Sequence, residues 1–208
     1  MEYRNSKMKI KFLGLLAFFV GASLFFLGCP KGLDENTSAF LFYISSIEPL
    51  ELASDVCSQS DPVLGCVAIT DDIINVSVTG DIKAQFKTQF QGGAPSGSLN
   101  NIIMKRYRIS FTKISGPPLT PDVPAPIEGA ITATIEIPTT VTIDLVAVPN
   151  YIKNEEPLVS LRNSPFGPVK TVELRCLATV EIWGIDLSGN TVQTNASFTV
   201  RFSDASVQ

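Results

Sequence analysis

The sequence contains no histidine at all, although it is 208 residues long. Histidine is the side chain most often used as a general acid or base near neutral pH, and it activates serine and cysteine nucleophiles and binds zinc and haem. Its absence excludes the histidine-based forms of those chemistries, including nearly every catalytic zinc site, and leaves carboxylate pairs or lysine as catalytic groups. We therefore predict a protein that is not an enzyme and that carries no cofactor.

Basic residues are also scarce once the N-terminal segment is set aside. Residues 29–208 hold 12 Lys and Arg against 19 Asp and Glu, a net charge near −7. Affinity for nucleic acid depends on cations that displace counterions from the phosphates. An acidic chain without a polybasic run is therefore not expected to bind nucleic acid.

The N-terminus has the pattern of an export signal. The first 11 residues hold four basic side chains and one acidic one, and Met8 is an alternative start. Residues 12–27 are apolar or small throughout. This run is shorter than the roughly 20 residues that a membrane-spanning helix needs, but it suits the apolar part of a signal peptide.

The apolar run ends in Leu24-Phe-Phe-Leu-Gly-Cys29, followed by Pro30. This ending resembles the lipobox of bacterial lipoproteins. The resemblance implies cleavage after residue 28, lipid on the Cys29 thiol and a further acyl chain on its freed amine. Because two acyl chains already give stable anchoring, three would hold the protein at the lipid bilayer permanently. The alternative is an uncleaved N-terminal membrane helix with an incidental cysteine.

The resemblance also predicts the location and the domain boundaries. In lipoproteins an aspartate after the lipidated cysteine favours retention in the inner membrane, and Pro30 is not aspartate. The expected location is therefore the cell envelope, with the outer membrane favoured. Residues 1–28 are predicted to be the signal peptide, residues 29–39 a polar tether, and residues 40–208 the folded domain.

Three cysteines remain after Cys29. Cys57 and Cys66 bracket a short segment with an Asp-Pro turn, and in an oxidising compartment we predict a disulfide between them, worth roughly 2–3 kcal/mol. The alternative is two unpaired thiols. Cys176 occupies an apolar position of a strand pattern, which predicts an inert core thiol.

The folded domain consists of segments in which apolar and polar residues alternate, the pattern of half-buried strands. Within residues 101–114, alternation puts Ile103 and Tyr107 on one face and Met104, Arg106 and Arg108 on the other. Residues 116–126 hold five prolines, too many for a regular element. The predicted strands lie within residues 40–44, 73–90, 101–114, 131–137, 141–147, 172–182 and 191–202.

About seven strands and no convincing helix predict an all-β protein, an antiparallel β-sandwich. The last two strands are joined by the turn Asp186-Leu-Ser-Gly-Asn190. The segment from Val180 to Val192, which includes the only tryptophan, Trp183, resembles the closing hairpin of bacterial Ig-like domains. The resemblance implies an Ig-like, or fibronectin-III-like, sandwich.

Two groups of side chains are candidate binding residues. Lys105, Arg106 and Arg108 form a basic cluster that would contact an anion or a partner; the alternative is a solvated sheet face or an edge strand guarded by charge. Asp186, with Ser188 and Asn190, offers oxygens to calcium, which needs six to eight of them. Turn chemistry alone explains such residues, so no metal site is expected unless Asp71 and Asp72 converge there.

The expected function is that of a membrane-anchored envelope lipoprotein whose domain binds or scaffolds another envelope protein or polysaccharide. One alternative is an envelope hydrolase that works through paired carboxylates, which must face each other across a cleft. Another is a calcium-stabilised adhesin. The carboxylates at strand positions are Glu136, Asp144, Glu173 and Glu181.

Overall fold

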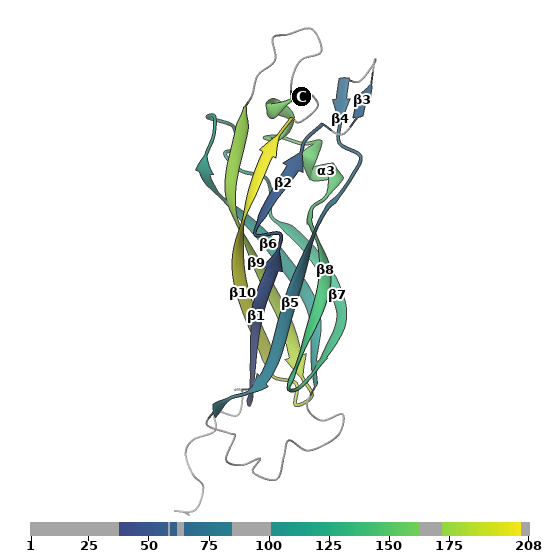
Figure 1. Cartoon of the computed structure of the whole chain (residues 1–208), viewed down its shortest axis with the longest axis vertical. Helices are drawn as coiled ribbons and strands as arrows, with labels where there is room; N and C mark the ends of the chain where they lie inside the picture. The colour runs from purple at the N-terminus through teal and green to yellow at the C-terminus, as the bar shows by residue number, and fades with distance from the viewer. Residues whose placement is uncertain (1–37, 58, 62–64, 85–100, 163–171, 205–208) are drawn as a thin grey trace, which may run out of the picture. The chain divides into compact units, whose positions relative to one another are not determined.

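The computed structural model describes residues 38–57, 59–61, 65–84, 101–162 and 172–204 (Figure 1). They belong to a compact unit that begins at Ser38 and includes the predicted domain. The predicted signal peptide, Cys29 and nearly all of the tether lie outside the described residues, as does the end of the strand predicted at 73–90. Among the residues described, no helix is long and apolar enough to span a membrane.

Eight strands form two sheets, and two short strands form a hairpin beside them (Figure 1). The three-stranded sheet has the order β1-β5-β8, and the five-stranded sheet has the order β2-β10-β9-β6-β7. The strands are β1 (Phe40–Glu48), β2 (Glu51–Asp55), β3 (Gln59–Asp61), β4 (Gly65–Val67), β5 (Asp72–Ile82), β6 (Asn101–Ser115), β7 (Ile127–Glu136), β8 (Thr139–Val148), β9 (Glu173–Asp186) and β10 (Thr191–Ser203); the helices are α3 (Asn150–Lys153) and a 3-10 turn (Val159–Leu161).

The predicted all-β sandwich is confirmed, with two differences in detail. Two sheets hold eight strands where about seven were expected. The pair β2–β10 is parallel, with Leu52 opposite Val200, so an entirely antiparallel sandwich is wrong for this pair. The reason is that the chain crosses from one sheet to the other between β1 and β2, without a hairpin, at Pro49 and Leu50.

The hydrophobic core lies between the two sheets, and the period-2 alternation of the sequence explains it. In β9 each second residue from Leu174 to Ile182 is fully buried, while the residues between them lie on the outer face. The hairpin of β9 and β10 pairs from Ile185–Thr191 to Glu173–Ser203 without a register shift. Facing side chains of the two sheets form one buried cluster, as in other β-sandwiches.

One predicted side-chain orientation is wrong. Simple alternation puts Ile103 inside and Met104 outside, but Met104 is fully buried and Ile103 is partly exposed. A register shift between Met104 and Arg106 leaves Lys105 as an extra residue, and such a β-bulge inverts the phase of alternation. From Tyr107 onward the predicted faces of β6 are confirmed.

The two lateral sides of the sandwich are built differently. On one side β1 lies against β10, and the backbone N–H of Ile44 donates to Thr194 Oγ1 at 3.2 Å. On the other side, β7 and β8 are the edge strands of different sheets; the turn at Pro138 joins them, and they contact each other. In the described ranges no further strand pairs with either of them. We call this side, where two edge strands face each other without pairing, the open side.

Candidate binding surface

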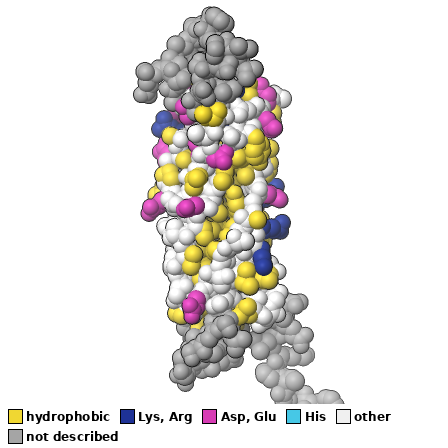
Figure 2. Space-filling model, turned by 90° about the vertical axis from the view of Figure 1, so that its right-hand side faces the viewer, with side chains coloured by type: hydrophobic (Ala, Val, Ile, Leu, Met, Phe, Trp, Pro, Cys, Tyr) yellow, Lys and Arg dark blue, Asp and Glu magenta, His cyan; other side chains and the backbone are white. Residues whose placement is uncertain are grey.

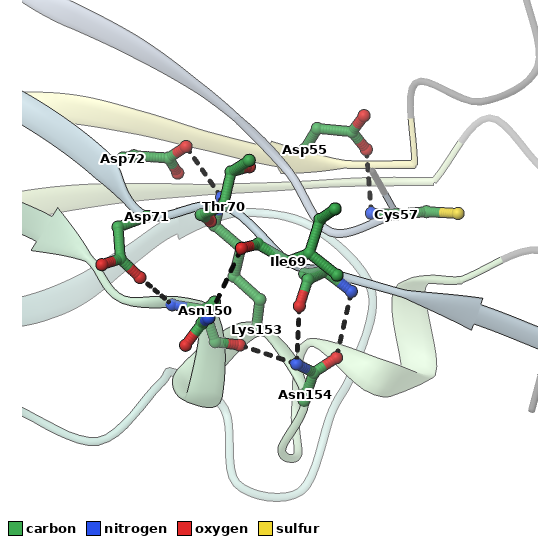
Figure 3. Close-up of polar contacts among 10 residues, drawn as sticks. Asp55, Cys57, Ile69, Thr70, Asp71, Asp72, Asn150, Lys153 and Asn154 are labelled. Atoms are coloured by element: carbon green, nitrogen blue, oxygen red, sulfur yellow. Dashed lines mark hydrogen bonds and ion pairs between the residues drawn. The ribbon is translucent and has the colours of Figure 1, made fainter. Parts of the chain in front are cut away.

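The end of the domain where β8 leads into α3 is built from hydrogen bonds between segments far apart in the sequence (Figure 3). The Asp71 carboxylate accepts from the backbone N–H of Asn150 at 2.7 Å, which satisfies a donor at the start of α3. The Asn154 side chain accepts from the backbone N–H of Ala68 at 3.1 Å and donates to its C=O at 2.9 Å. These bonds hold residues 68–71 against α3.

Lys153 is the one lysine that the described structure buries completely, at 0% exposure. Its Nζ atom lies 2.7 Å from Asp72 Oδ1 and 3.0 Å from the backbone C=O of Thr70 (Figure 3). Because a buried ammonium is costly unless it is paired and hydrogen-bonded, this geometry fixes α3 to the start of β5.

Arg162 connects the same region to the end of β2. Its Nε donates to the C=O of Val56 at 3.0 Å, and its Nη2 donates to the C=O of Lys153 at 2.8 Å. Cys57, which follows Val56 in the sequence, is disulfide-bonded. The side chain of Cys66 lies outside the described residues, so Cys66 as the partner stays a prediction.

Three large apolar side chains are exposed on this hydrogen-bonded framework. Ile69, Ile73 and Tyr151 are each 55% exposed. Ile73 pairs with Val146 of β8, and the Asn150 side chain, next to Tyr151, donates to the C=O of Ile69 at 3.5 Å. We call Ile69, Ile73 and Tyr151 the apolar tip. Apolar side chains held out into water by a rigid framework are typical of a protein-binding site.

The sequence contained a signal for the apolar tip that alternation alone does not use. Ile73 and Ile74 are adjacent, and in a strand adjacent residues face opposite sides. Ile74 is fully buried, so Ile73 has to be on the outer face. Ile73, the apolar residue that breaks the alternating pattern, is therefore the one that the fold exposes.

Tyr107 spans the open side between β7 and β8. Its hydroxyl donates to the C=O of Val146 at 3.2 Å, and its ring lies so close to Gly129 that a Cβ there would meet the ring at 2.2 Å. Burial raises the pKa of Tyr107; the hydrogen bond to Val146 lowers it, and the proximity of Tyr151 and Asp71 raises it. The ring thus closes the open side at the end near the apolar tip.

Apolar side chains follow the rest of the open side. Val141 and Ile143 of β8 and Ala133 of β7 point inward in the strand pattern, but they are only partly buried. Figure 2, which views the domain from the side of β7 and β8, shows hydrophobic side chains in a stripe along this face. The two edge strands therefore border an apolar strip.

The predicted basic cluster lies on the outer face of the five-stranded sheet, with all three side chains exposed. The Arg106 guanidinium lies 4.5 Å from the centre of the Trp183 ring, and Arg108 Nε is 3.8 Å from Glu128 Oε1. β6 is an inner strand, so these residues do not guard an edge. Two of the three have partners within the sheet, which is the pattern of a solvated sheet face.

The predicted turn at Asp186–Asn190 is confirmed. Asp186 Oδ1 accepts the backbone N–H groups of Ser188 and Asn190, each at 2.9 Å. Burial raises the pKa of Asp186, but hydrogen bonds from Ser38, Asn190 and the two backbone groups outweigh it and hold the pKa below its usual value. With the Asn190 side chain donating to Oδ2, these contacts engage both carboxylate oxygens of Asp186.

Asp72, one of two carboxylates considered as additional calcium ligands, does not converge on this turn. Ser38 bonds Asp186 and precedes Phe40, which pairs with Ile82 at the end of β5. Asp72 begins the same strand, at its opposite end. In the part of the chain that the structure describes, no group of three or more Cys, Asp or Glu side chains could hold a metal ion.

The remaining sequence candidates are also placed. Cys176 is a buried free thiol, and burial raises its pKa to about 11, as expected of an inert core position. Asp144, in the three-stranded sheet, accepts from Asn75 Nδ2, whereas Glu173 of β9 pairs with Arg201 at 3.0 Å. Glu136 ends β7, and Glu181 lies within β9.

Comparison of the chain with models of known protein families, with curated protein sequences and with solved structures finds no match.

Proposed function

We propose that this protein is a membrane-anchored envelope lipoprotein whose Ig-like β-sandwich binds another envelope protein without catalysing a reaction. Lipid on Cys29 would place the domain at a membrane surface, and the apolar tip would contact the partner. The observation that carries the binding function is the exposure of Ile69, Ile73 and Tyr151 on a framework held by a buried ion pair. Such residues supply the central contacts of protein interfaces.

The test is site-specific photo-crosslinking in the producing cells. A photoreactive amino acid replaces Tyr151 in the full-length protein, and in a matched control it replaces Leu187, which is 45% exposed at the β9–β10 turn. We expect position 151 to give one discrete crosslinked protein that position 187 does not give. Equal crosslinking from both positions, or none from 151, contradicts the proposed binding site.

The anchor is tested separately, by Cys29→Ser and cell fractionation. We expect the wild-type protein in the membrane fraction, lighter by residues 1–28 and heavier by its acyl chains in intact mass spectrometry. The variant lacks the thiol that accepts the lipid, so it should show neither the loss of residues 1–28 nor the added mass of the acyl chains. Membrane-bound wild-type protein of unmodified full-length mass would instead identify the N-terminal run as an uncleaved membrane helix.

A further inference from the structure

The free edge of β8 differs from the three other sheet edges. Soluble proteins protect edge strands by keeping them short, by bulges, by proline or by lysine. β2 has five residues, β1 contains a register shift at Ser45, and β7 pairs irregularly with β6 between Ala130 and Ala133. β8 has ten residues with no proline, lysine or arginine, and its pairing is regular from Thr139 to Val146. It is the least protected edge of the described sheets.

The residues of β8 also specify what would lie beside it. Val141 and Ile143 point inward yet are partly exposed at the open side. A strand added here would place each second residue over the same apolar strip, because cross-strand neighbours share a face. Tyr107 occupies the C=O of Val146, so the available stretch runs from Thr139 to Leu145.

The charges of the three-stranded sheet all have one sign. β1, β5 and β8 contain Glu48, Asp72, Asp81 and Asp144 and no Lys or Arg; of the four carboxylates, Asp72 is paired with Lys153 of α3. Asp144 is exposed on the outer face of β8 itself. Opposite charges on adjacent strands stabilise a sheet, and like charges destabilise it. The sheet therefore favours a basic strand over an acidic one, and a second copy of β8 would bring only further acid.

We infer that the edge of β8 from Thr139 to Leu145 binds an extended, basic strand of a partner protein by β-augmentation. The bound strand alternates apolar residues, which cover Val141 and Ile143, with polar ones, and it has Lys or Arg opposite Asp144. Backbone hydrogen bonds supply affinity and the alternating side chains supply specificity. The inference rests on the proposed binding function and names the class of partner segment and the edge that receives it.

The test uses full-length lipidated protein in detergent and a fluorescein-labelled synthetic peptide, Thr-Val-Thr-Val-Lys-Val-Thr-Val-Thr. Two control peptides carry Glu in place of Lys, or Pro in place of the second and third Val. Fluorescence anisotropy gives the dissociation constants. We expect the Glu peptide to bind about tenfold more weakly than the Lys peptide, because one close charge pair becomes repulsive. The Pro peptide should not bind, because proline has no backbone N–H to donate to the edge.

Variants then identify the edge. Asp144→Asn should abolish the preference for Lys over Glu, whereas Asp81→Asn, which removes the same charge from the central strand β5, should retain it. Val141→Lys should abolish binding, and Thr132→Lys on β7 should not. Hydrogen exchange should slow at residues 139–145 when the Lys peptide is bound.

The inference is overturned if no peptide binds, if Asp144→Asn leaves the preference unchanged, or if protection appears on β7. In each of these cases, a discrete crosslink from position 151 in cells would still support the proposed binding function. Failure of the strand-addition inference is thus distinguishable from failure of the proposed function.

Discussion

The two sheets of the sandwich use their charges in opposite ways. The five-stranded sheet contains all of the basic strand residues described, and most of them have partners close by: Arg175 and Arg201 form a closed ring with Glu51 and Glu173, in which the four N–O distances are 3.0–3.3 Å. In the strands of the three-stranded sheet, all of the charged residues are acidic. Its outer face is a ladder of hydroxyl and amide side chains, such as Thr79–Thr140 at 2.8 Å.

The long strands of the five-stranded sheet also differ from β8 in how completely their inward side chains are buried. β6, β9 and β10 are the longest strands, and almost all of their inward residues are buried. In β8 the inward residues Val141 and Ile143 are only partly covered. The difference suggests a division of roles, in which the five-stranded sheet stabilises the fold and the edge of the smaller sheet remains available for binding.

The largest expected effect tests this division directly. Phe202→Ala should lower the free energy of unfolding by about 3–5 kcal/mol, because Phe202 is fully buried in β10 and packs edge-on against Phe111 at 5.8 Å. Val141→Ala, in the edge of β8, should cost about 1 kcal/mol, since its side chain is partly solvated already. Urea denaturation of both variants measures the difference. Equal costs would mean that the β8 edge is core and not a binding surface.

The second prediction concerns the ion pair that joins α3 to the smaller sheet. Lys153→Met keeps the aliphatic volume but leaves Asp72, 16% exposed, without its cation, and should cost about 3 kcal/mol. Adding Asp72→Leu should recover part of the loss, because the uncompensated charge is then gone. Urea denaturation of the two variants gives the values. If the double variant is less stable than Lys153→Met, the charge of Asp72 is not the cause.

The third prediction tests the closure of the open side. Gly129→Ala puts a methyl group where the Tyr107 ring lies, so the ring must move and its bond to Val146 must break. The expected cost is about 1–3 kcal/mol. In a Tyr107→Val background the same substitution should cost less, because the ring is absent. Thermal denaturation of the wild type, the two single variants and the double variant completes this double-mutant cycle. If the costs of the two substitutions are additive, the Tyr107 ring is not the reason for a glycine at position 129.

The long strands could be predicted because their burial follows from alternation alone. β9 and β10 alternate for most of their length, and the turn between them has the Asx and Gly residues that such turns require. The prediction of Cys176 as a core thiol is confirmed for the same reason. Where one face of a strand is buried continuously, local sequence is sufficient to place a side chain.

The candidate binding surface could not be predicted in this way, because it depends on contacts between distant residues. Nothing near Lys153 in the sequence indicates that Asp72, 81 residues away, pairs with it. The bulge at Lys105 shifts the faces of β6 without a glycine or proline to mark it. The short strands β2, β3 and β4 are not evident in the alternation, because three to five residues give too few repeats.

The smallest expected effect concerns the exposed ring of charges on the five-stranded sheet. Hydrogen bonds from Arg175 and then Arg201 hold the pKa of Glu51 below its ordinary value of 4.5. A lowered pKa in the folded state means that this carboxylate stabilises the fold at neutral pH. That contribution is lost as the pH falls below 4.5 and through the folded-state pKa. Glu51→Gln should therefore lower the melting temperature slightly at pH 7 and not at pH 2.

Salt separates this contribution from a general effect of net charge. Exposed ion pairs are weak and are screened, so the difference at pH 7 should shrink further in 1 M salt. Glu48→Gln removes an exposed carboxylate from the smaller sheet, where no basic strand residue is described, and serves as the matched control. Because that substitution relieves repulsion among acids, it should leave the melting temperature unchanged or raise it. A loss as large as that of Glu51→Gln would contradict the contrast between a sheet of paired charges and a sheet of acids alone.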